Sequence, residues 1–332
     1  MSSRKNIAFV TGGYSEESVI SYKSAITIEN NLDREKYNIY KIDITPNGWW
    51  YEGEDNGQKT AVDREDFSIN RADKKVIFDA VFIGIHGTPG EDGKLQGYFD
   101  LLRLPYTSCD AATSALTFNK RYTVAVASFA GISVAKSLHI FKHARIGGQQ
   151  ILTQLQLPVF VKPNNGGSSI GMSKVSKADE MDAALEKAFK EDDQVLIEEF
   201  ITGREFTIGV FRSNGKIETL PFTEVRTHKE FFDFEAKYTP GMSEEITPAQ
   251  VDEAVAEKVR ETARKVYHTF NCRGVVRMDF IYNEEKQQPF LLEINTVPGQ
   301  SEASIVPQQV RARGWSLKEF YSMLIEEALS ST

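Results

Sequence analysis

Short apolar runs recur in the first 108 residues with segments of helical spacing between them, and this alternation restricts the fold more than any other feature. NIAFVTGG (6–13) and FDAVFIGIHG (78–87) predict buried strands that end at glycine turns, and YNIYKIDIT (37–45) alternates like a third strand. This strand–helix–strand order predicts a doubly wound parallel sheet. The expected helices cover residues 14–32, with Ser15 as the N-cap, and 94–104.

The pattern changes near residue 108 and becomes mostly antiparallel after residue 204. Residues 205–225 alternate on either side of Asn214-Gly215, which predicts a hairpin. Residues 52–75 are polar and punctuated, so we expect irregular structure there. We predict an α/β chain, α+β in its C-terminal part, with domains at 1–108, 109–197 and 198–332. The other expected elements are helices over 112–132, 176–192, 248–271 and 316–329, strands within 158–175 and over 194–201, and a hairpin over 274–295.

Charge and cysteine content exclude several classes of protein. The 332-residue chain has a net charge of −8, which argues against non-specific binding to nucleic acid or to an anionic membrane. Cys109 and Cys272 are far apart and lack CxxC spacing, so neither a structural zinc nor a disulfide framework is expected. The sequence has no 18-residue apolar run. These features predict a protein of the reducing cytoplasm.

The hairpin GVVRMDFIYNEEKQQPFLLEIN predicts a metal site. Alternation puts Arg277 and Asp279 on one face of its first strand, and Glu293 and Asn295 on one face of the second. A turn near residue 286 sets Asp279 opposite Glu293, a pairing of like charges that destabilises a sheet unless a cation lies between them. Oxygen-only ligands suit Mg²⁺ or Mn²⁺. The alternative is a pair of solvated acids on an exposed face.

The stretch VKPNNGGSSIG predicts an anion-binding loop. Its glycines let backbone N–H groups surround a phosphate, Ser168 and Ser169 add hydroxyl donors, and Lys162 ends the preceding strand. Neither the Walker A spacing nor a GxGxxG fingerprint occurs, so a dinucleotide site is unsupported. A flexible hairpin tip would have a similar sequence.

Three single residues have competing interpretations. His86 ends an apolar strand, where doubly wound sheets bind ligands, but a lone histidine also serves to hold a neighbouring loop. Glu17 near a helix N-terminus either favours the helix dipole or pairs with a substrate amine. Lys120 in TFNKRY is a solvated lysine unless it faces a phosphate.

Taken together in this order, the motifs closely resemble those of the D-alanine–D-alanine ligases, enzymes of the ATP-grasp fold. The resemblance runs almost end to end and includes GGYSEESVIS, HGTPGEDGKLQGYFDLLRLPYTS, PVFVKPNNGGSSIGMSKV, FEAKY and RMDFIY…LLEINTVPGQSEASIVP. It implies that ATP phosphorylates the carboxylate of one D-alanine. The amine of a second D-alanine then attacks the acyl phosphate, which yields the dipeptide for peptidoglycan synthesis.

The resemblance also implies a role for each matched residue at the nucleotide. Phosphoryl transfer needs cations to offset charge that develops on the phosphate. The implied contacts are two Mg²⁺ (or Mn²⁺) ions at Asp279, Glu293 and Asn295, the ATP phosphates at Lys120 and Lys162, and adenine and ribose at Glu198, Phe200, Ile201 and Glu205.

At the substrates, the resemblance implies that Glu17 holds the first ammonium group, with His86 nearby. Arg277 and the Gly299 N–H would stabilise the tetrahedral intermediate, and Ser304 and Ile305 would border the second D-alanine. The segment QSEASI departs from the commoner family pattern after the proline-glycine pair. This departure lies in the segment that the resemblance places at the second substrate.

The aromatic stretch FFDFEAKYTPG (231–241) becomes a predicted lid by the same resemblance. Tyr238 would form a hydrogen-bonded trio with Ser168 and Glu17, and Lys237 would reach the γ-phosphate. Closing such a lid excludes the water that would hydrolyse an acyl phosphate.

Several alternatives remain open at this point. D-alanine–D-lactate and D-alanine–D-serine ligases differ in the EAKY segment, which is intact here, and the HGTPGEDG match argues against an ATP-grasp ligase for other substrates. A non-catalytic nucleotide-binding regulator would be expected to have lost its metal ligands. The resemblance suggests a homodimer.

Overall fold

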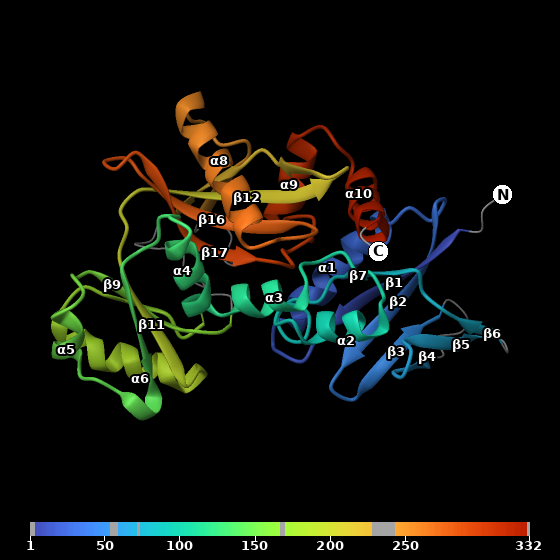
Figure 1. The fold of residues 1–332 in the computed structure, drawn as a ribbon, viewed down its shortest axis with the longest axis horizontal. Helices are drawn as coiled ribbons and strands as arrows, with labels where there is room; N and C mark the ends of the chain where they lie inside the picture. Colours follow the sequence, from blue (N-terminus) through green and yellow to red (C-terminus); the bar gives the residue numbers. More distant parts are fainter. Residues whose placement is uncertain (1–3, 54–58, 72–73, 167–169, 228–242, 331–332) are drawn as a thin grey trace.

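The strands of the computed structural model form three sheets that follow one another along the chain (Figure 1). The structure describes residues 4–53, 59–71, 74–166, 170–227 and 243–330.

The first sheet has the strand order β6-β5-β4-β3-β2-β1-β7, and β1 pairs in parallel with both β2 and β7. Side chains alternate along β1, so Ile7 and Phe9 pack with α1 and α10, whereas Ala8 and Val10 pack with α2. Helices thus cover both faces, and the predicted doubly wound parallel unit is confirmed for these three strands. The elements are β1 (Lys5–Gly12), α1 (Ser18–Asn31), β2 (Tyr37–Thr45), β7 (Ala80–Ile83), α2 (Lys94–Leu102) and α10 (Leu317–Ser330).

Two predictions for this region are wrong. Residues 52–75 contain strands that extend the sheet in antiparallel fashion after β3 (Gly48–Glu52): β4 (Lys59–Asp63), β5 (Ser68–Arg71) and β6 (Lys74–Val76). These strands are only three to five residues long, which leaves too few positions for an alternating pattern to be recognised in the sequence. The N-cap of α1 is Glu17, whereas Ser15 was predicted. Ser15 accepts a hydrogen bond from the N–H of Ser18 at 3.1 Å, and it does so through its backbone oxygen.

The second sheet has the order β10-β9-β11-β8 and is covered by α6. Its core contains Val161, Leu185 and Ile197. The strand–loop–strand, helix and strand predicted between residues 158 and 201 are confirmed. The elements are β8 (Ser137–Phe141), α5 (Gly148–Leu152), β9 (Val159–Pro163), β10 (Ser173–Val175), α6 (Met181–Glu191) and β11 (Gln194–Glu199).

The helix predicted over residues 112–132 is interrupted. Asn119 has extended backbone angles between α3 (Ala111–Phe118) and α4 (Lys120–Phe129). Its side-chain oxygen accepts from the N–H of Tyr122, so it caps α4. The break puts Lys120 at the first position of α4.

The third sheet has the order β15-β14-β12-β16-β17, and β13 also pairs with β12. Phe206 and Ile208 of β12 pack against α8, whereas Phe211 packs with α10 on the opposite face. The predicted turn at Asn214-Gly215 is confirmed, and both residues have positive φ angles. The elements are β12 (Arg204–Ser213), β13 (Lys216–Thr219), β14 (Thr223–Thr227), β15 (Ser243–Ile246), α8 (Glu253–Thr269), β16 (Val276–Asn283), β17 (Gln288–Asn295) and α9 (Ile305–Ala312).

The last described helix returns to the first sheet. The Tyr321 ring of α10 packs edge-on against Phe82 of β7, with ring centroids 5.4 Å apart, and Figure 1 shows α10 beside α1 and β7. The domain boundaries at residues 108 and 197 stay predictions. Within the described ranges, no helix has the length and apolar character needed to cross a bilayer.

Candidate active site

The β16–β17 hairpin gathers one basic and two acidic side chains. The register pairs Asp279 with Glu293 and Arg277 with Asn295, which confirms the predicted pairing, and a bulge follows Asp279. Arg277 donates to Asp279 through Nε at 3.1 Å and Nη2 at 2.8 Å, and to Glu293 through Nη2 at 3.0 Å. A guanidinium therefore offsets the like-charge pair that the sequence predicted.

Burial governs the ionisation of this cluster. Burial raises the pKa of Asp279, Arg277 opposes that rise, and the charge of Glu293 adds to it. Burial alone would lower the pKa of Arg277, but Asp279 and Glu293 outweigh it and the pKa is raised. The Arg277 guanidinium therefore stays charged, and it stabilises the ionised forms of both neighbouring carboxylates.

The donor atoms fit a hard divalent cation. Asp279, Glu293 and Asn295 present oxygen ligands at neighbouring positions of the hairpin. The Asn295 side-chain oxygen also accepts from the N–H of Val297 at 3.0 Å, which fixes the direction of the amide. Within the described ranges, no group of three or more Asp, Glu, His or Cys side chains is arranged to hold a metal ion, so a metal here would rest on two carboxylates and an amide.

A first cavity of about 430 Å³ lies between the second and third sheets and contains the residues predicted to bind a nucleotide. Lys162 of β9 and Glu198 of β11 form a nearly buried ion pair in its wall. Lys120 donates to the Gly166 carbonyl at 2.6 Å, which joins α4 to the glycine loop. The predicted residues in its lining are Lys120, Lys162, Glu198, Phe200, Ile201, Glu205, Asp279 and Glu293.

A second cavity of about 490 Å³ contains the residues predicted to bind substrates. It shares Lys120, Glu205, Asp279 and Glu293 with the first cavity. Every predicted site residue that the structure describes thus lines one cavity or both. Those in the second cavity alone are Glu17, His86, Arg277, Asn295, Gly299, Ser304 and Ile305.

His86 has a structural role as well as a place in the second cavity. Its ring Nε2 is joined by a hydrogen bond to Ser24 Oγ at 2.9 Å, and its backbone N–H donates to Ser21 Oγ at 2.9 Å. Burial lowers the pKa of His86 to about 4, so the ring is neutral at pH 7. Ser24 Oγ also accepts from the N–H of Gln300 at 3.1 Å, which links His86 to the segment that carries Gly299.

Gly87 allows the loop after His86 to approach Glu17. Its φ is +66°, and a Cβ there would lie 2.5 Å from both Glu17 Oε2 and Ser15 Oγ. A larger residue would displace the carboxylate from the cavity.

The QSEASI segment, which departs from the family pattern, forms part of the wall of the second cavity. Ser304 is the N-cap of α9, but its hydroxyl is joined to Ser301 Oγ at 2.8 Å and does not cap the helix. A Cβ on Gly299 would lie 2.9 Å from Ser304 Oγ. The chain is therefore tightly packed where the second substrate is expected.

Glu91 was not among the predicted site residues, although it lies in the HGTPGEDG motif. Glu91 is buried in the second cavity, and its Oε2 accepts from the N–H of Gly87 at 2.6 Å. Burial raises its pKa to about 8; the charges of Glu17 and Glu293 add to the rise, and the Gly87 hydrogen bond and Arg277 oppose it. Its burial depends on the packing of several loops, which the sequence pattern does not reveal.

Replacing Glu91 by glutamine should flatten the pH dependence of stability. A carboxyl whose pKa is raised in the folded state stabilises that state below its unfolded pKa, and the effect is lost as pH rises toward about 8. Wild-type stability should therefore fall with pH by up to about 1.4 kcal/mol per pH unit from this group alone. Urea unfolding at pH 5.5 and 7.5 measures the difference.

Glu16→Gln, at an exposed position close to Glu17 in sequence, is the control and should leave the wild-type slope unchanged. Equal slopes in wild type and Glu91→Gln would show that Glu91 is ionised in the folded protein.

Glu245 was also missed. It lines the second cavity from β15, a strand that was not predicted, and its carboxylate accepts from Gln308 at 2.7 Å. Burial raises its pKa, with the Gln308 hydrogen bond and Arg277 opposing. The predicted lid at 231–241, with Lys237 and Tyr238, and the loop residue Ser168 lie outside the described residues.

Comparison with known proteins identifies relatives over almost the whole chain. The family model described as D-ala D-ala ligase N-terminus matches residues 6–109, and that described as D-ala D-ala ligase C-terminus matches residues 120–326. The D-alanine–D-alanine ligase of Parabacteroides distasonis is 44% identical over 328 residues, which cover 99% of this chain and 98% of that protein.

Solved structures show the same similarity. The VanG D-Ala:D-Ser ligase from Enterococcus faecalis superposes with a TM-score of 0.87 at 31% identity, covering 98% of this chain and 100% of that one. The D-alanine–D-alanine ligase from Bacillus anthracis complexed with ATP has a TM-score of 0.78 at 27% identity, covering 98% of each chain. The similarity therefore includes all three sheets.

Proposed function

This chain belongs to the D-alanine–D-alanine ligase family, and from that premise we propose that it joins two D-alanine molecules into D-alanyl-D-alanine as ATP becomes ADP and phosphate. The observation that carries the proposal is that Asp279 and Glu293 line both cavities. A phosphoryl group leaving a nucleotide in the first cavity can reach a carboxylate in the second while it stays beside the same two acids.

The reaction divides into two steps. The bond between the γ-phosphorus and its bridging oxygen breaks as a carboxylate oxygen of the first D-alanine bonds to that phosphorus, giving ADP and an acyl phosphate. The amine of the second D-alanine then attacks the carbonyl carbon, loses a proton and expels phosphate. Fixed positive charge near both centres lowers the barriers, because both steps pass through states with concentrated negative charge.

Residues of the first cavity are proposed to hold ATP. Lys120 and Lys162 are assigned to the phosphates, and Lys162 would exchange its ion pair with Glu198 for a phosphate oxygen. Glu198 and Glu205 are assigned to adenine and ribose. Phe200 would pack against the base beside Phe160, whose ring centroid lies 5.8 Å away, and Ile201 would pack there too.

Residues of the second cavity are proposed to hold the amino acids. Glu17 would pair with the ammonium group of the first D-alanine, and Gly87 leaves room for its carboxylate. Arg277 and the Gly299 N–H would bind the oxyanion of the tetrahedral intermediate. Ser304 and Ile305 would contact the second D-alanine at the start of α9.

Asp279, Glu293 and Asn295 would hold Mg²⁺ or Mn²⁺, two ions in our proposal. Such a cation offsets the charge of the phosphates. The oxygen-only donor set supports this assignment.

The dipeptide would serve peptidoglycan synthesis, as expected for this family. We also propose a cytoplasmic homodimer and the three domains 1–108, 109–197 and 198–332. The lid at 231–241 would close the active site, with Tyr238, Ser168 and Glu17 in one hydrogen-bonded trio and Lys237 at the γ-phosphate.

A second candidate is a D-alanine–D-serine ligase. The similarity to the VanG D-Ala:D-Ser ligase and the serine-rich QSEASI segment favour it. A serine side chain would need a hydrogen-bond partner, and Ser301 or Ser304 at the second-substrate wall would supply one.

Phosphate release should be fast with D-alanine as the only amino acid. The assay supplies ATP, Mg²⁺ and D-alanine, and compares this mixture with others in which D-serine or D-lactate is added as the second substrate. Product mass spectrometry should show mainly D-alanyl-D-alanine. A mixed product that dominates at equal concentrations would favour the second candidate, and no turnover on D-alanine would overturn the assignment.

A further inference from the structure

A third cavity lies away from the two described above, where the first sheet meets the third. Its volume is about 200 Å³, and Arg103, Arg212 and Arg273 line it. These arginines come from three segments: Arg103 directly follows α2, Arg212 lies on β12, and Arg273 lies between α8 and β16. We call this space the arginine cavity.

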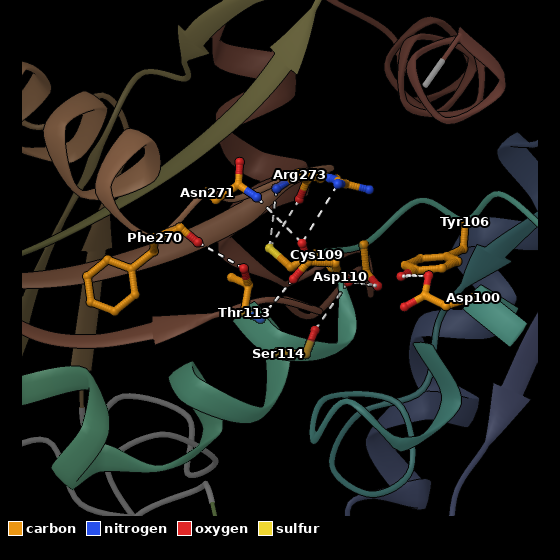
Figure 2. A network of polar contacts seen from close by, with 10 residues as sticks. Asp100, Tyr106, Cys109, Asp110, Thr113, Ser114, Phe270, Asn271 and Arg273 are labelled. Carbon is orange, nitrogen blue, oxygen red and sulfur yellow. Dashed lines mark hydrogen bonds and ion pairs between the residues drawn. The ribbon is translucent and has the colours of Figure 1, made fainter. Parts of the chain in front are cut away.

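Close backbone contacts fix its wall. A Cβ on Gly274 would lie 2.0 Å from the Thr107 carbonyl oxygen, so the two segments touch. Figure 2 shows the neighbouring contacts: the Cys109 thiol donates to the Arg273 carbonyl at 3.3 Å, and the Arg273 N–H donates to Cys109 Sγ at 3.4 Å. Arg273 is thereby held beside the segment 104–107, which bridges to β7 through Tyr106 and Val81.

Arg212 is half-buried and forms no ion pair within the part of the chain that the structure describes, although Glu327 lines the same cavity. Its Nε is buried and has no hydrogen-bond partner there. A buried N–H donor without an acceptor is costly, and an anion in the cavity would supply acceptors to the Arg212 guanidinium.

Two of the nearby acids already have partners, and one of these partners is an arginine of the cavity itself. Asp100 accepts from the Tyr106 hydroxyl at 2.7 Å (Figure 2). Asp110 accepts from the N–H of Thr113 at 2.8 Å and lies 3.7 Å from Arg273. Glu327 also lines the cavity. The charged side chains that line it are therefore three arginines and two acids, whereas the whole chain has a net charge of −8. Positive charge is thus concentrated here against the overall charge of the protein.

We propose that the arginine cavity binds a small phosphate-type oxyanion, which accepts hydrogen bonds from Arg212 and the two neighbouring guanidinium groups. Arginine suits phosphate oxygens because its planar fork can donate two parallel hydrogen bonds. A whole nucleotide is too large, since pockets for drug-sized ligands start at roughly 300 Å³. The bound anion would connect the segment 104–107 to β12 and stabilise their contact.

Calorimetric titration of inorganic phosphate into the full chain tests this site. The first cavity is kept filled with Mg²⁺ and a non-hydrolysable ATP analogue, so that phosphate cannot bind there. We expect one site per chain and at least tenfold weaker binding in Arg212→Gln. The melting temperature should rise with phosphate in wild type but not in Arg212→Gln.

Arg313→Gln is the matched control, because Arg313 is exposed beside Trp315, outside the arginine cavity, and the charge change is the same. It should bind phosphate like wild type. Arg103→Gln, at an exposed loop position, replaces the Arg212 variant if that one fails to fold, and should also weaken binding. No titratable site in wild type, or equal binding in a folded cavity variant, would overturn the proposal. Tighter binding of succinate than of phosphate would overturn the assigned ligand class.

Discussion

Replacing Asp279 by asparagine should lower kcat for ATP-dependent phosphate release by roughly 100-fold or more. Asparagine keeps the shape of the side chain but removes one of the two carboxylates proposed to hold the metal between the cavities. The variant should also need a higher Mg²⁺ concentration for half-maximal rate. Initial rates over a Mg²⁺ series measure both effects.

The fold should survive this change, because Arg277 keeps its contact with Glu293. Glu284→Gln is a suitable control: Glu284 is exposed at the turn of the same hairpin, so its loss should change neither kcat nor the Mg²⁺ requirement. Wild-type kcat and Mg²⁺ dependence in Asp279→Asn would refute the metal assignment.

Replacing Arg277 by methionine should reduce both stability and activity. Asp279 is buried and Glu293 half-buried, and the guanidinium is the cation that the structure places between them. Breaking one partner from such a buried cluster costs about 3 kcal/mol in free energy of unfolding. Loss of the proposed oxyanion contact should lower kcat by roughly 100-fold as well. Urea unfolding and steady-state assays give the two numbers separately.

Added Mg²⁺ should restore part of the stability of Arg277→Met, because a divalent cation can replace the guanidinium between the carboxylates. Arg277→Lys should retain more stability than the methionine variant. Arg260→Met, which breaks ion pairs at the surface of α8 with Glu253 and Glu257, should cost less than about 1 kcal/mol. If methionine at position 277 costs no more than methionine at position 260, the cluster is not held by its charges.

Sequence reasoning succeeded where the determinants are local. The pairing of Asp279 with Glu293 follows from strand alternation and from the short turn, both of which lie within one hairpin. The glycine turn at Asn214-Gly215 was predictable for the same reason, since its backbone conformation restricts the residue types.

It failed where distant segments decide the outcome. Glu91 acquires its raised pKa from burial among loops that are far apart in sequence, and no pattern in GEDG reports that burial. Arg277 was assigned to the tetrahedral intermediate, and its ion pairs with Asp279 and Glu293, two of the three predicted metal ligands, were not foreseen. The interruption at Asn119 was also missed, because apolar periodicity continues across it while the capping hydrogen bond depends on one side chain.

The position of α10 has a consequence for synthesis on the ribosome. One face of the first sheet, with Phe9 and Phe82, is completed by Phe320 and Tyr321, which are translated only after the other two sheets. Until α10 is synthesised, the apolar side chains on this face of the first sheet stay exposed. Chaperone binding during translation should therefore matter most for this sheet. Once α10 docks, the earliest and latest parts of the chain become one cooperative unit, which makes late truncation damaging to the sheet that forms first.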